Sequence, residues 1–119
     1  MIAHVVLFRP KPDLPAEERR ALIDALAAAL RDIPSIRRAR IGRRIHIGRS
    51  YEQLTRTDLP YAAILEFDHV DALKAYLDHP AHEEISTRFF AAIADTLIYD
   101  FEMEGSADGL RGMLAPESC

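Results

Sequence analysis

The sequence predicts an α+β fold in which a four-stranded antiparallel sheet carries its helices on one face. Segments with the two-residue repeat of strands are interleaved with segments that have the 3.6-residue repeat of helices. Their order is β-α-β-β-α-β, and the second helix is broken at His79-Pro80. The length of 119 residues suits one domain. Together these observations indicate the ferredoxin-like βαββαβ arrangement, a split βαβ fold.

The first strand is predicted over residues 2–8, which are β-branched, aromatic or small apart from one histidine. Both of its faces are apolar, so we expect both to be buried, and Pro10 to end the strand. Alternation divides its side chains between the two faces: Ile2, His4, Val6 and Phe8 on one, and Ala3, Val5 and Leu7 on the other.

The first helix is predicted from Pro15 to about Ile33. Proline suits the first helical position, and Glu17 and Glu18 follow in the first turn, where the helix dipole favours acids. Pro34 disfavours the α conformation in the residue before it, which ends the helix. One apolar stripe runs along this helix: Leu22, Ile23, Leu26, Ala29, Leu30 and Ile33.

The second strand is predicted over residues 36–47, with Gly42 as a bulge, followed by a loop over 48–59. Five arginines lie between Arg37 and Arg44, which favours an edge strand, because charge discourages edge-to-edge pairing. A solvated edge is the favoured interpretation of these arginines. The alternative is a binding site for an anionic group such as a carboxylate or a CoA phosphate.

The second half of the chain repeats the pattern. A strand is predicted over 60–68, a short helix over 70–77, a further helix from Pro80, and a last strand over 96–103. The helix that starts at Pro80 has an apolar stripe of Ile85, Phe89, Ala92 and Ile93. We therefore expect a folded domain over residues 1–103. Residues 104–119 contain three glycines and Pro116, so we expect a mobile or loosely packed tail.

Composition excludes several classes of function. The formal net charge of −4 gives no global basic field, so nucleic acid is not an expected partner. No apolar run reaches the ~20 residues of a membrane helix. Met1 leads directly into the first strand without a secretory pattern, and the single cysteine is Cys119. The sequence therefore predicts a cytoplasmic protein without disulfides or a thiol-based metal site.

The face of the sheet that carries no helix is predicted to be apolar. A patch of that size exposed on a monomer is unfavourable, and twofold dimers are the commonest oligomers. We expect a homodimer that forms through this sheet face, with the two sheets packed into a dimeric α+β barrel.

Residues 76–82 concentrate the titratable groups of the chain: Tyr76, His79 and His82 lie within seven residues. His82 falls in the first turn of the helix that starts at Pro80, where the dipole and burial both disfavour imidazolium, so it is the candidate general base. His79 is the candidate helix cap. His4 interrupts an apolar strand and is expected to face Tyr76 and His82. Purely structural roles for these side chains remain open, and a zinc site is less favoured because few further ligands are near.

Four segments resemble the stress-responsive dimeric α/β barrel (Dabb) family, which includes the plant polyketide cyclase olivetolic acid cyclase. They are residues 2–8, residues 32–36, the Tyr-Leu-Asp-His-Pro-Ala-His run at 76–82, and residues 98–101. The resemblance covers about residues 1–103. It implies a dimeric α+β barrel and no cofactor. It also implies that His82 is the general base, Tyr76 its hydrogen-bonding partner, and His4 the group that orients a substrate carbonyl.

The sequence predicts a pocket, for which three functions are considered. The first strand forms its floor, the first helix its wall and residues 76–82 its lid. The expected lining residues are Val6, Phe8, Leu22, Leu26, His79 and Ile85. The first hypothesis is a cofactor-independent, polyketide-cyclase-like enzyme that transfers protons next to a carbonyl. The alternative is a non-catalytic stress-response dimer, or one that binds a small apolar ligand. A third hypothesis follows from sibling folds, which include haem-binding and cofactor-independent monooxygenases.

Overall fold

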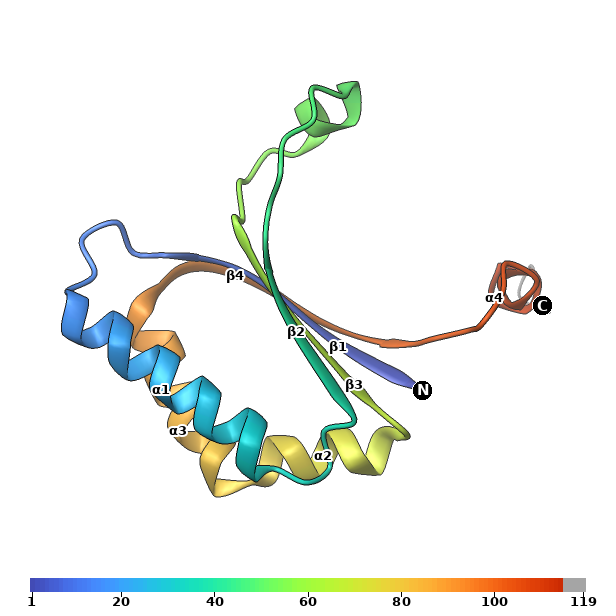
Figure 1. Ribbon diagram of the computed structural model, residues 1–119. Coiled ribbons are helices and arrows are strands. Elements are labelled where there is room, and N and C mark those ends of the chain that lie inside the picture. The colour runs from blue at the N-terminus through green and yellow to red at the C-terminus, as the bar shows by residue number, and fades with distance from the viewer. Residues whose placement is uncertain (115–119) are drawn as a thin grey trace, which may run out of the picture.

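The computed structural model describes residues 1–114, and Figure 1 shows the arrangement of the elements. The first half contains the strand β1 (Ile2–Pro10), the helix α1 (Ala16–Asp32), the strand β2 (Arg38–Arg43) and a 3₁₀ helix, η1 (Ser50–Leu54). The second half contains β3 (Tyr61–Phe67), α2 (Val70–Asp78), α3 (Pro80–Ala92), β4 (Ile93–Glu102) and the short α4 (Gly109–Met113).

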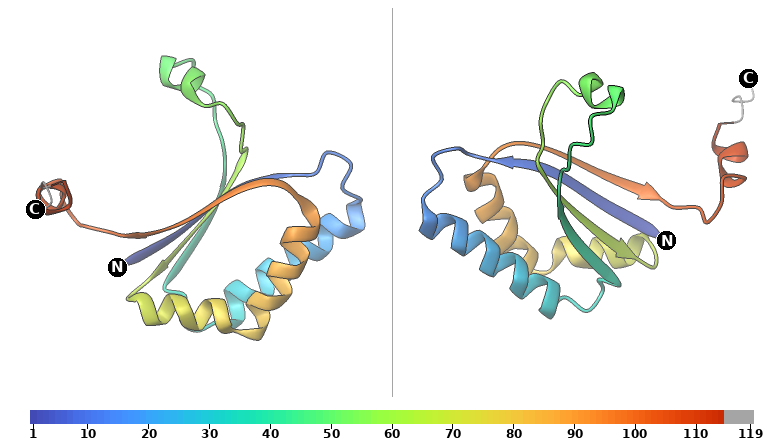
Figure 2. Two further views of the ribbon diagram at one scale, coloured as in Figure 1. Left: turned by 180° about the vertical axis from the view of Figure 1, so that it is seen from behind. Right: turned by 45° about the horizontal axis from the view of Figure 1, so that its top comes forward.

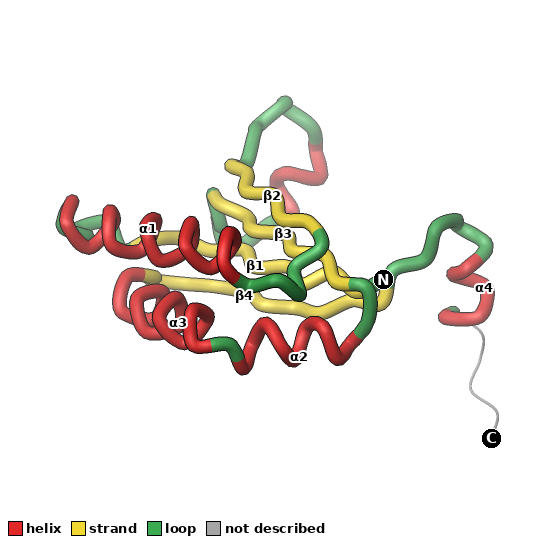
Figure 3. Tube along the Cα trace, turned by 60° about the horizontal axis from the view of Figure 1, so that its bottom comes forward, coloured by secondary structure: helices red, strands yellow, loops and turns green. Residues whose placement is uncertain are grey.

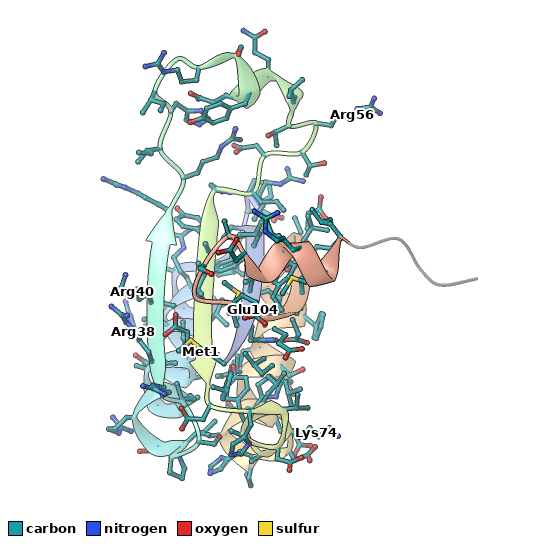
Figure 4. The ribbon with its side chains drawn as sticks, turned by 90° about the vertical axis from the view of Figure 1, so that its right-hand side faces the viewer. Met1, Arg38, Arg40, Arg56, Lys74 and Glu104 are labelled. Carbon is teal, nitrogen blue, oxygen red and sulfur yellow. The ribbon has the colours of Figure 1, made fainter. Side chains whose placement is uncertain are left out.

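The four strands form one antiparallel sheet in the order β2-β3-β1-β4. The helices α1, α2 and α3 lie together on one face of it (Figures 1 and 3). The predicted ferredoxin-like βαββαβ fold is therefore confirmed. The strand β2 lies at an edge of the sheet, as its arginines predict, and Figure 4 shows Arg38 and Arg40 projecting from it.

Several predicted boundaries are wrong by a few residues. The strand β2 pairs regularly through Gly42, which lies opposite Ala62, so it contains no bulge there. Pro15 precedes α1 as its N-cap instead of occupying the first helical position. Ile93 belongs to β4, because the backbone becomes extended at this residue although its spacing continues the apolar stripe of α3. The strand β1 extends past the predicted Phe8 and ends at Pro10, the proline expected to end it; a register shift there accommodates a residue without an N–H.

The core lies between the helices and the face of the sheet formed by alternate residues of β1 and β3. Phe67 and Leu65 are its largest fully buried side chains, and Ala29 and Ile33 cover them from α1 and its C-terminal end. Ile23 was expected in the buried stripe of α1 but is 57% exposed, because it lies one position past Leu22 and points away from the sheet. The face of the sheet that the helices cover carries alternate residues of β1, including His4, as the two-residue repeat predicts.

The opposite face of the sheet carries no helix (Figure 1). Its central row, set by the strand register, consists of Arg40, Ile64, Val5 and Tyr99. Ile64 is 41% exposed and Tyr99 54% exposed in the single chain. This surface, which we call the open face, matches the predicted apolar patch.

Residues 44–60 form an arm that extends away from the sheet between β2 and β3 and contains η1 (Figure 2). The carboxylate of Glu52 organises it. Its Oε1 accepts hydrogen bonds from the N–H groups of Ile47 and Arg49, both at 2.9 Å, and His46 Nδ1 lies 3.0 Å from Oε2. Gly48, between the two donors, has a φ of 77°, a conformation that glycine adopts readily and that allows both N–H groups to converge on one oxygen.

The Glu52 carboxylate is expected to control the order of the arm at acid pH. The N–H of Arg49 and then that of Ile47 lower the pKa of Glu52 from 4.5 to about 2. Because the pKa is lower in the folded arm, the stabilisation is complete above pH ~4.5 and is lost as the pH falls towards ~2. The amide NMR signals of Ile47 and Arg49 should therefore titrate with a midpoint near 2, and Glu52→Gln should abolish the titration. A midpoint near 4.5 would contradict this assignment.

The chain after β4 leaves the sheet and forms α4 beyond its end (Figure 2). Residues 115–119, the last part of the expected tail, lie outside the described residues. Mobility of the tail therefore stays a prediction. Within residues 1–114, no helix combines the length and apolar character needed to cross a membrane.

Candidate functional site

A cavity of about 200 Å³ lies between the sheet and the helix layer. The sheet contributes side chains from β1, β3 and β4, and the helix layer contributes α1, α2 and α3. Apart from His4, Tyr76, His82 and Ser86, the lining side chains are apolar. Of the expected lining residues, the structure places these at the cavity: Val6, Phe8, Leu22, Leu26 and Ile85.

His4 is 5% exposed and lies on β1 with its ring at the cavity. Its Nδ1 is 2.6 Å from Oδ1 of Asp100, so an Nδ1–H donates to the carboxylate. The strand register explains this contact, because Asp100 of β4 is the direct partner of His4 across the β1–β4 pair. With Nδ1 occupied in this way, Nε2 is the nitrogen left to interact with a ligand.

Tyr76 lies in the last turns of α2 and is buried. Its ring is in edge-to-face contact with His82, at a centroid distance of 4.6 Å, and with His4, at 5.8 Å. Burial raises the pKa of the phenol to about 12, so it stays protonated and can donate a hydrogen bond. The expected hydrogen bond between Tyr76 and His82 is not among those found in residues 1–114, where the two rings pack against each other instead.

His82 lies in the first turn of α3 and faces the same cavity. Burial lowers the pKa of its imidazole, the nearby His4 lowers it further, and a hydrogen bond with the Leu77 carbonyl partly opposes both. A neutral imidazole has one ring N–H and one nitrogen with a free lone pair. A neutral imidazole is what a general base requires.

His79 does not line the cavity, which corrects the expectation from the sequence. It is the N-cap of α3, and its Nδ1 accepts a hydrogen bond from the Ala81 N–H at 3.0 Å. The ring turns back onto its own backbone because that N–H has no partner within the helix. The two histidines of the helix break therefore have separate places: His79 caps, and His82 faces the cavity.

Two polar residues of the site were not recognised in the sequence. Asp100 alternates with the apolar residues of the last strand, and antiparallel pairing with the first strand would have placed it near His4. Ser86 is four residues after His82 and therefore on the same face of α3. Within residues 1–114 no three histidine, cysteine, aspartate or glutamate side chains form a group that could hold a metal ion.

A four-stranded antiparallel sheet with its helices on one face, and an apolar cavity that holds two imidazoles and a phenol between them, defines a ferredoxin-like α+β protein with a candidate site between sheet and helices. A family model named Stress responsive A/B Barrel Domain (Dabb) matches residues 2–103. The chain belongs to this family. No curated protein matches the chain by sequence.

Solved structures with this fold come from plants and bacteria. The Arabidopsis thaliana protein At3g17210 superimposes with a TM-score of 0.72 at 21% identity, over 90% of this chain and 99% of that one. A hydroxynitrile lyase from Passiflora edulis gives 0.70 at 17% identity, over 88% and 94%. A protein of unknown function from Thermobifida fusca, described as dimeric and ferredoxin-like, gives 0.65 at 24% identity, over 86% and 90%. At these identities the likeness shows the fold alone.

Proposed function

We propose that the cavity is the active site of a cofactor-independent enzyme that transfers protons next to a carbonyl group, as in a polyketide-cyclase-like ring closure or an isomerisation. The observation that carries the proposal is the meeting of His82, Tyr76 and His4 in an otherwise apolar cavity. The enzyme acts as a homodimer in the cytoplasm, and its ligand is a small, largely apolar carbonyl compound.

The first step is removal of a proton from the carbon next to the carbonyl. The free nitrogen of His82 takes the proton, and the electron pair of the broken C–H bond moves towards the carbonyl oxygen to give an enolate. The phenol O–H of Tyr76 is one donor for that oxygen. His4 orients the carbonyl by donating from Nε2, which requires the imidazolium form that pairs with Asp100. Few other dipoles compete in the apolar cavity, so these hydrogen bonds are stronger than in water.

The second step decides the product class. If the enolate carbon attacks a second carbonyl of the same molecule, a ring closes and the His82 proton passes to the new alkoxide. If the substrate has a C=C bond beside the α-carbon, the enolate is a dienolate, and return of the His82 proton to its far carbon moves the double bond next to the carbonyl. Both outcomes balance without a redox partner or a cofactor.

The Passiflora edulis structure supports a catalytic role, because it shows that this fold is used by an enzyme. The predominantly apolar lining favours the second candidate, a non-catalytic dimer that binds a small apolar molecule. The two candidates differ in whether a bound carbonyl compound loses an α-proton.

Exchange of α-protons tests this difference directly. Acetophenone, a small aromatic ketone, is incubated with the protein in D₂O, and the methyl ¹H signal is followed by NMR. We expect its exchange to be faster than in buffer with an equal concentration of free imidazole. Binding without faster exchange would favour the non-catalytic candidate, and the absence of both binding and exchange would contradict the proposal.

A further inference from the structure

Ser86 is a polar group of the cavity to which the proposed chemistry gives no role. It lies on α3, one turn after His82, and the two residues line the same cavity. Its nearest lining neighbours along the helix are apolar: Ile85, Phe89 and Phe90. The cavity therefore has a group of three polar side chains, and Ser86 adds a hydroxyl further along the helix that carries His82.

The hydroxyl of Ser86 is free to meet a ligand. Serine and threonine within helices commonly donate to the carbonyl four residues earlier. The adjacent Thr87 does so, with its Oγ1 3.1 Å from the Glu83 oxygen. Among the hydrogen bonds of residues 1–114 none involves the Ser86 side chain, although the His82 carbonyl occupies the equivalent position. Two neighbouring hydroxyls of one helix thus differ, and the one at the cavity is the one without a partner.

We infer that Ser86 is a specificity-determining residue that binds a second oxygen of the ligand, and that the ligand is a carbonyl compound with a hydroxyl or second carbonyl about one helical turn from the α-carbon that His82 deprotonates. The inference rests on the proposed function, since the first oxygen is the one that Tyr76 and His4 receive. His82 and Ser86 are four apart on one helix, so their Cβ atoms are ~5–6 Å apart, and this sets the spacing between the α-carbon that His82 deprotonates and the second oxygen.

The surroundings of Ser86 make the position of the second oxygen selective. An oxygen placed against Phe8, Leu26 or Phe89 would lose its hydrogen bonds to water and gain none, which costs more than a hydrogen bond contributes. An oxygen placed at Ser86 gains a partner. The remaining atoms of the ligand are apolar, because the remaining walls are.

Two isomeric phenols and their parent ketone test the inference. In 3-hydroxyacetophenone the hydroxyl oxygen lies ~5–6 Å from the methyl carbon that His82 would deprotonate, which matches the spacing above; acetophenone lacks this hydroxyl. In 4-hydroxyacetophenone the hydroxyl lies on the axis of the ring and further from the methyl carbon. Dissociation constants are measured by ¹⁵N NMR titration of the full chain. We expect wild type to bind the 3-hydroxy compound severalfold, up to about tenfold, more tightly than acetophenone, in line with one added neutral hydrogen bond.

Ser86→Ala should remove this preference and leave the affinity for acetophenone within about twofold, because alanine is well tolerated in a helix and no protein contact is lost. Thr87→Ala is the matched control, and it should keep the preference. The inference is overturned if Ser86→Ala still prefers 3-hydroxyacetophenone to acetophenone, or if wild type binds acetophenone without that preference. Either result leaves the proposed function standing. If none of the three compounds binds, the proposed function fails with the inference.

Discussion

Replacing His82 with alanine is expected to lower the rate of α-proton exchange by ~10²-fold or more, the usual contribution of a general base. The affinity for acetophenone should change little, since the imidazole removes a proton and contributes only part of the cavity wall. The comparison is made by NMR at saturating ketone, so that the rate at the bound ligand is measured apart from binding.

The pH profile of exchange gives a second signature of the same base. Burial and the neighbouring His4 lower the pKa of His82 below its ordinary value of 6.5, so the neutral, active form prevails at neutral pH. The rate should fall only as the pH drops below 6.5, with an inflection on the acid side of the ordinary value. An inflection above 6.5, or a profile that is the same in His82→Ala, would exclude His82 as the base.

His79→Ala is the matched control from the same helix break. It removes a histidine three residues away that caps α3 and does not line the cavity. The loss of an N-cap lowers the free energy of unfolding by ~1 kcal/mol, which thermal unfolding measures, and exchange should continue at the wild-type rate. If His79→Ala and His82→Ala lost exchange equally, helix structure would explain the effect better than general-base catalysis.

The sequence predicts the fold well because periodicity and proline breaks are local signals. The sequence also predicts that His4, Tyr76 and His82 lie on one side of the sheet. Alternation along the strand assigns His4 to a face of the sheet, and helical spacing assigns Tyr76 and His82 to the helix faces that meet it. The Asp100 partner of His4 was missed for a different reason. Its contact depends on the pairing and register of β1 with β4, strands separated by 96 positions at this contact, and alternation alone specifies neither.

Residue spacing in the sequence also does not predict the direction of the side chains at the helix break. Spacing places His79 and His82 close together but does not say that one ring turns back to cap an N–H while the other faces the cavity. The same limit applies to Ser86, whose spacing from His82 is evident in the sequence. Whether its hydroxyl bonds the preceding turn, as that of Thr87 does, depends on its rotamer.

The open face links the single chain to the proposed homodimer. Its aromatic and aliphatic side chains project from all parts of the sheet except β2, where Arg38 and Arg40 occupy the edge. Edge charges are compatible with an interface whose apolar centre is buried and whose rim is solvated. A carboxylate placed at the centre of this face should therefore oppose association and leave the fold of the chain intact.

Ile64→Asp places a carboxylate at that centre, beside Val5, where the wild-type side chain is 41% exposed in the single chain. In a twofold dimer each substitution occurs twice, and Arg40, the cross-strand neighbour of residue 64, offsets only part of the several kcal/mol that burying each carboxylate costs. The dimer dissociation constant, measured by sedimentation velocity, should therefore rise by at least ~10³-fold. Ile23→Asp, at a more exposed isoleucine on α1, is the matched control and should leave association unchanged. A dimer of Ile64→Asp with wild-type affinity would move the interface away from the open face.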